Sequence, residues 1–185
     1  MKKLLILIFI FLFFSCPNEE GINPTEPKDV IELLPLDNEI SGWTRKGEMD
    51  VAENDEQLTD LINGEGQVFI DHGFVKFARQ WYQGNVADAT REIRLRIFDM
   101  GDTTNAKDVY DAVGIGTETP WTDNNAGVEA RIDETLLFDY KIDFWDDRFY
   151  VWVTIKDEKT PAGLNVAKLF CLNVSNAIRD TTESD

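Results

Sequence analysis

An alternation of apolar and polar residues in the second half of the chain constrains the fold most. Apolar side chains occupy every second position of one stretch, at Leu136, Phe138, Tyr140, Ile142 and Phe144. Successive side chains of a strand point to opposite faces, so this period of two predicts a strand with one buried face. Turn-forming Asp146 and Asp147 follow, and residues 149–155 are an apolar run. We therefore expect an antiparallel hairpin over residues 136–155.

Other segments extend this hairpin into a sheet covered by helices. We expect further strands over residues 74–82, 92–98 and 128–133, a polar connection over 83–90 and a loop over 115–127. Helical spacing and end signals predict helices over 55–63, 103–113 and 161–178, with a short helical turn over 68–72. Asn54, Asp102 and Thr160 stand where they can cap the three longer helices. The result is a single α+β domain, an antiparallel sheet with helices packed against it.

Length and charge narrow the class of protein. The chain has 185 residues, 43% of them hydrophobic, which suits one globular domain. Its formal net charge is −17, whereas a protein that tracks nucleic acid needs a basic surface. Two cysteines are too few for a disulfide-rich scaffold. We therefore expect one acidic domain with no nucleic-acid partner.

The first 16 residues have the composition of a secretory signal. Lys2 and Lys3 precede the eleven apolar residues 4–14, and Ser15 and Cys16 follow. At ~1.5 Å per residue the run covers about 16 Å, roughly half of a ~30 Å hydrocarbon core, so it is too short to span a membrane. With a cysteine at the cut, the segment resembles a bacterial lipoprotein signal. That resemblance implies lipidation of Cys16; an ordinary signal with a chance cysteine is the alternative.

The expected layout has four parts. A signal peptide covers residues 1–15, and a polar tether containing several prolines covers residues 16–32. The α+β domain covers 33–179, and a disordered acidic tail covers 180–185. In lipoproteins of this type an aspartate after the cysteine signals retention in the inner membrane, and this chain has Pro17 there. We therefore expect a bacterial envelope protein anchored to the membrane by its N-terminal lipid, in the outer membrane.

No combination of residues indicates catalysis, a metal site or a cofactor. His72 is the only histidine and stands where an imidazole can bond the last carbonyls of a short helix. Cys171 lies on the apolar stripe of the last predicted helix, as a buried cysteine does. Two groups of side chains offer oxygen ligands for Ca²⁺, but capping and turn roles explain them better: Asp99, Asp102, Asn105 and Asp108, and Asp139, Asp143, Asp146 and Asp147.

Tryptophans are further candidates for contact with a small molecule. Trp121 and Trp145 fall in a loop and a turn, where exposed rings can stack on sugars. We favour the plainer interpretation that the five tryptophans of the chain cap the edges of the sheet.

A short basic stretch interrupts the acidic chain. It contains Lys76, Arg79, Arg91, Arg94 and Arg96. Arg94 and Arg96 share the polar face of one predicted strand, and a positive face on an acidic protein can receive an anionic ligand or an acidic protein partner. The favoured alternative is cross-strand pairing of these two arginines with Asp139 and Asp143.

The segment Asn63-Gly64-Glu65-Gly66 is the loop most suited to face a ligand. Its two glycines let backbone amides approach an anion, so Asn63, Gly64 and Gly66 are candidate ligand-binding residues. No Lys-Ser or Lys-Thr pair follows, so it is no nucleotide-phosphate loop. The favoured alternative is a simple helix stop.

Most of the chain resembles an uncharacterised family of bacterial envelope domains. The matching pieces, in order, are Leu33-Leu34-Pro35, Gly42-Trp43 with Arg45 and Gly47, Leu61-Ile62-Asn63-Gly64, Gly73-Phe74, and Ile97-Phe98-Asp99-Met100-Gly101. Family members often carry a second glycine directly after Asn-Gly, where this chain has Glu65. The resemblance implies one compact α+β domain and supplies no catalytic residue.

These observations favour a lipid-anchored envelope protein that binds a partner or small ligand without catalysis. The alternative is an envelope hydrolase, with or without a metal, built on acidic loop residues. A third interpretation is a membrane-tethered spacer.

Overall fold

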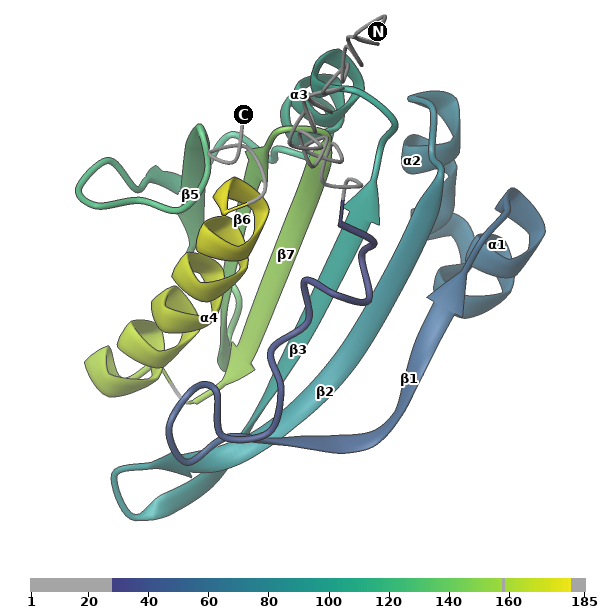
Figure 1. Ribbon diagram of the computed structural model, residues 1–185. Helices are drawn as coiled ribbons and strands as arrows, with labels where there is room; N and C mark the ends of the chain where they lie inside the picture. Colours follow the sequence, from purple (N-terminus) through teal and green to yellow (C-terminus); the bar gives the residue numbers. More distant parts are fainter. Residues whose placement is uncertain (1–27, 158, 181–185) are drawn as a thin grey trace, which may run out of the picture.

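The computed structural model describes residues 28–157 and 159–180, and it places seven strands in one antiparallel sheet (Figure 1). The order across the sheet is β1-β2-β3-β7-β6-β5-β4. The strands are β1 (Thr44–Ala52), β2 (Lys76–Val86), β3 (Ala89–Asp99), β4 (Thr119–Pro120), β5 (Glu129–Asp133), β6 (Asp139–Asp146) and β7 (Phe149–Lys156). The helices are α1 (Asp55–Ile62), the 3-10 helix η1 (Asn63–Gly66), α2 (Gln67–Asp71), α3 (Thr103–Ala112) and α4 (Pro161–Arg179). The predicted α+β class is confirmed.

The predicted hairpin and helix caps are present. Strand β6 pairs with β7 across the turn at residues 147–148, although β6 begins at Asp139 rather than at residue 136. The side chains of Asn54, Asp102 and Thr160 accept from the backbone amides of Gln57, Asn105 and Gly163 at 3.0, 2.9 and 3.1 Å. Each cap satisfies an amide that the helix itself leaves without a partner, and this fixes where each helix starts.

The strands differ from the expected ones in three places. The predicted polar connection over 83–90 is instead the paired ends of β2 and β3, which leave only Ala87 and Asp88 as the turn. Gln83 and Asn85 are exposed there, and a ladder of backbone hydrogen bonds holds polar residues as well as apolar ones. Strand β1 was not predicted, because this edge strand is partly exposed and carries few apolar side chains. The two-residue β4 lies inside the predicted loop 115–127.

One face of the sheet carries the main core. Helix α4 and the segment 30–43 lie across this face (Figure 1). The Phe170 ring of α4 lies 5.0 Å from the Tyr82 ring and 5.4 Å from the Trp43 ring, measured between centroids. Val30 is buried in the same cluster, so the packed chain begins ahead of residue 33.

The opposite face is divided into two halves. Helices α1, α2 and α3 cover the first, which we call the covered half, where the Phe69 and Phe98 rings stack at 3.8 Å and Phe77 and Tyr150 are buried beside them. The second, the open half, consists of the outward side chains further along β2, β3, β7 and β6: Arg79, Trp81, Arg94, Arg96, Lys141, Trp152 and Thr154. Asp143 of β6 is buried at the boundary of the two halves, bonded to Tyr150 of the covered half.

The expected signal peptide over residues 1–15, Cys16, most of the tether and residues 181–185 of the tail lie outside the described residues. Within the described part of the chain, no helix is long and apolar enough to cross a membrane.

Candidate functional site

The open half is an ordered arrangement of arginine and tryptophan side chains. Across the strands, Arg79 of β2, Arg96 of β3 and Trp152 of β7 are register partners. In the next row, Trp81 faces Arg94, which faces Thr154. Along β3 these positions alternate with Leu95 and Ile97, which are buried on the α4 face. The alternation of β3 therefore puts two arginines side by side on one face.

Each of the two arginines lies over an indole ring. The guanidinium carbon of Arg94 is 5.3 Å from the Trp81 ring centroid, and that of Arg96 is 4.5 Å from the Trp152 centroid. The Lys141 ammonium approaches the same Trp152 ring at 4.4 Å. A cation within about 6 Å of an aromatic face is attracted by the ring quadrupole. These stacks fix the arginine heads without neutralising their charge.

The expected pairing of Arg94 and Arg96 with Asp139 and Asp143 is wrong. Strand β7 lies between β3 and β6, so Trp152 separates Arg96 from Asp143. Oδ2 of Asp143 accepts instead from Nε and Nη2 of Arg131, at 3.0 and 2.7 Å. Arg94 and Asp139 attract each other through space, but among the described residues no hydrogen bond or ion pair joins them. The sequence shows which residues share a face of a strand, but it does not show the order of the strands.

The structure brings together two candidate sites that the sequence analysis treated separately, the segment Asn63–Gly66 and the arginine pair. Nη1 of Arg96 donates to Oε2 of Glu65 at 3.2 Å, so the segment Asn63–Gly66 borders the open half. This segment ends α1, as the helix-stop interpretation expects, and continues as η1 into α2. The residue with positive φ is Asn63, with φ of 53° and ψ of −142°, rather than Gly64. Gly64 is exposed and Gly66 is buried against Leu58 and Ile62.

The two arginines are short of compensating contacts. Burial, together with the charge of Arg94, lowers the pKa of Arg96 to about 10. Burial and the charge of Arg79 lower the pKa of Arg94. Nε of both arginines and Nε1 of Trp152 are buried with no hydrogen-bond partner among the described residues. A buried donor without an acceptor is costly, and such groups need an explanation. The open half therefore holds two cationic side chains whose burial is only partly compensated.

The other predicted site residues have structural roles. Nδ1 of His72 lies 2.7 Å from the carbonyl oxygen of Val68, at the end of α2, as expected. Cys171 is buried on α4, and burial raises the pKa of its thiol well above the usual value. Asp102 caps α3, and Asp99 pairs with Arg148 at 2.9 Å. In the described ranges, no three His, Cys, Asp or Glu side chains lie close enough to hold a metal ion.

The tryptophans divide differently from the expectation. Trp121 and Trp145 were the candidates for an exposed stacking surface, but both are buried, so that interpretation is wrong. Trp81 and Trp152 are half-buried and face the open half. The period of two along β2 and β7 is the sequence signal that places these two rings on the polar faces of their strands.

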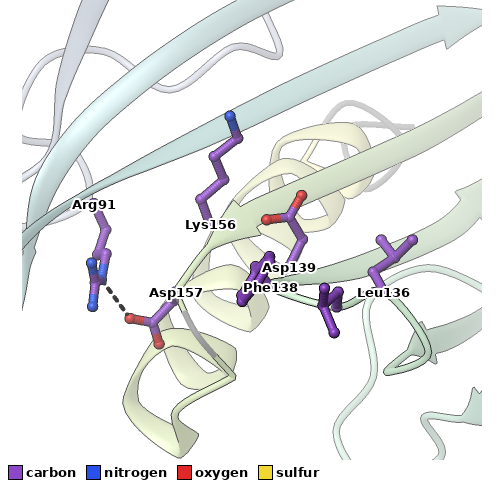
Figure 2. Close-up of a pocket in the computed structure, with 7 residues that line it drawn as sticks. Arg91, Leu136, Phe138, Asp139, Lys156 and Asp157 are labelled. Carbon is purple, nitrogen blue, oxygen red and sulfur yellow. Dashed lines mark hydrogen bonds and ion pairs between the residues drawn. The ribbon is translucent and has the colours of Figure 1, made fainter.

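A cavity lies at the end of the sheet where β6 begins and β7 ends. It has a volume of about 660 Å³ and is lined by Leu136, Leu137 and Phe138, with Arg91 and Lys156 among its polar residues (Figure 2). Nε of Arg91 donates to Oδ1 of Asp157 at 2.8 Å. Leu137 is 77% exposed, although it was expected within a strand. Leu136, Leu137 and Phe138 are three consecutive apolar residues and so depart from the period of two. This departure is the sequence signal that the strand begins only after them.

Comparison with known proteins identifies a fold and no family. The crystal structure of the extracellular domain of PknH from Mycobacterium tuberculosis matches with a TM-score of 0.52 and 10% sequence identity. The match covers 86% of this chain and 100% of that chain. No family model and no curated protein matches. At this identity the likeness shows a shared α+β fold.

Proposed function

We propose that the chain is a lipid-anchored bacterial envelope protein that binds a small anionic ligand, without catalysis, at the open half of its sheet. The observation that carries this proposal is the pair Arg94 and Arg96, stacked on Trp81 and Trp152 with buried Nε donors that have no partner. Carboxylate and phosphate are the groups that a guanidinium binds best, through two parallel hydrogen bonds.

Electrostatics favours an anion at this place. Desolvation and mutual repulsion oppose the charged forms of Arg94 and Arg96, as the lowered pKa of each indicates. An anion bound between them would relieve both effects, and its binding would raise both pKa values. The chain as a whole is strongly acidic, but the open half gathers Arg79, Arg94, Arg96 and Lys141 on one face, and these charges attract an anion.

Envelope location is supported by the N-terminal segment. The basic start, the apolar run and Cys16 resemble a lipoprotein signal, and Pro17 favours the outer membrane. The PknH domain of similar fold is extracellular, which is compatible with a location of this chain outside the cytoplasm. The resemblance to the envelope-domain family stays a prediction.

Ligand binding is tested by titrating the full chain, purified in detergent, with citrate and separately with inorganic phosphate. We expect at least one of the two to bind and the double variant Arg94→Gln/Arg96→Gln to bind it about tenfold more weakly or not at all. The matched control, Lys107→Gln/Lys168→Gln, removes two positive charges from α3 and α4, away from the open half. Equal loss in both double variants would show a general charge effect and contradict the site.

A separate experiment tests the anchor. Cys16→Ala should move the protein from the membrane fraction to the soluble fraction and abolish the mass increase of lipidation. A variant that stays in the membrane fraction without a mass change would contradict lipidation.

A further inference from the structure

Arg96 is closed off by one exposed carboxylate. Its side chain is 6% exposed, whereas that of Glu65 is 61% exposed, and the two meet at 3.2 Å. Behind this contact lie the Trp152 ring and the Nε of Arg96, which is buried and has no partner. In the described conformation an anion therefore reaches Arg94, which is half-buried, but reaches Arg96 only if Glu65 gives way.

The backbone around Glu65 has room to change conformation. Glu65 lies between Gly64 and Gly66, and Gly64 is exposed with open space where a Cβ would be. Among the described residues, the hydrogen bond from Arg96 is the one that the Glu65 side chain takes part in. Only the Glu65 end of this ion pair is exposed, so water competes with Arg96 for the Glu65 carboxylate.

Resting on the proposed function, we infer that Glu65 is an internal competitor that occupies the place of a ligand carboxylate on Arg96 until a carboxylate-bearing small molecule displaces it. The ligand then bridges Arg94 and Arg96, and Glu65 turns outward into solvent. The internal occupant indicates the ligand class, because it shows that Nη1 of Arg96 is placed to donate to a carboxylate oxygen that comes from the solvent side.

The inference has a direct test with citrate as the probe. Glu65→Gln keeps the size of the side chain and removes its charge, so citrate affinity should rise about two- to fivefold. In the Arg96→Gln background the same substitution should leave citrate affinity unchanged, because the contact is already gone. Glu56→Gln, an exposed acid at the start of α1, is the matched control for loss of one negative charge.

Hydrogen exchange supplies a second, independent measurement. Saturating citrate should speed amide exchange over residues 63–66 in the wild-type chain and leave it unchanged in Arg96→Gln. An unchanged exchange rate in the wild-type chain at saturation would contradict the displacement of Glu65.

The outcomes separate the two proposals. If citrate binds through Arg94 and Arg96 but Glu65→Gln weakens it, or matches Glu56→Gln, the competitor role is overturned and the binding site stands. If phosphate binds more tightly than citrate in every variant, the carboxylate class is overturned. If neither anion binds any folded variant, the proposed function itself fails.

Discussion

Two arginine–carboxylate pairs on the same face of the sheet have opposite characters. Asp143 is fully buried, accepts twice from Arg131 and also accepts from the Tyr150 hydroxyl at 3.0 Å. Glu65 is exposed and accepts once from Arg96. Both arginines are largely buried, but solvent reaches the carboxylate only in the second pair. The comparison teaches that burial and two-point geometry make such a pair structural, whereas exposure leaves it free to exchange partners.

The largest expected effect comes from breaking the buried pair. Asp143→Ala removes a buried carboxylate that accepts from both Arg131 and Tyr150, and leaves Arg131 with only the longer 3.8 Å carboxylate contact to Glu118, so the free energy of unfolding should fall by about 3–5 kcal/mol. Glu65→Ala, measured in the same urea titrations, should lower it by only about 1 kcal/mol, because Glu65 is itself exposed and accepts a single hydrogen bond. Equal losses in the two variants would remove the distinction between the pairs.

The second effect tests the covered half of the same face. Phe98 stacks on Phe69 and contacts Phe77 and Tyr150, so Phe98→Ala should lower the free energy of unfolding by about 3–5 kcal/mol through lost packing and a cavity. Citrate affinity, corrected for the folded fraction, should not change. An altered affinity in the folded variant would show that the two halves are coupled.

The smallest effect distinguishes a binding residue from a stabilising one. Burial and Arg79 disfavour the charged form of Arg94, so replacing it by a neutral side chain removes an unfavourable contribution. Arg94→Gln should leave the free energy of unfolding unchanged or raise it by up to about 1 kcal/mol, while it weakens anion binding. A loss of stability above about 1 kcal/mol in urea unfolding would show that Arg94 mainly holds the fold together.

Local sequence pattern predicted those parts of the fold that local chemistry decides. The alternation around Tyr140 and Ile142 placed β6, and Asn54, Asp102 and Thr160 marked where helices begin. Edge strand β1 carries no clear period, since its exposed residues pack little and a register shift between Lys46 and Asp50 interrupts it. Such a strand exists because β2 offers it backbone partners, and that is not visible in its own residues.

The candidate site was predicted in pieces and not as a whole. Arg94 and Arg96 were placed on one face by the period of two, and the glycine-containing segment around Glu65 was recognised by its composition. Their contact depends on how α1 and η1 pack beside β3, which is a long-range property. The choice of Arg131 rather than Arg96 as the partner of Asp143 depends likewise on strand order.

The most direct test of the binding site is citrate titration of the wild-type chain beside Arg94→Gln/Arg96→Gln, with thermal unfolding recorded for both. We predict that the wild-type chain binds citrate and that the double variant loses at least about tenfold in affinity while remaining folded. Unchanged citrate affinity in the folded double variant would show that the open half is not an anion site.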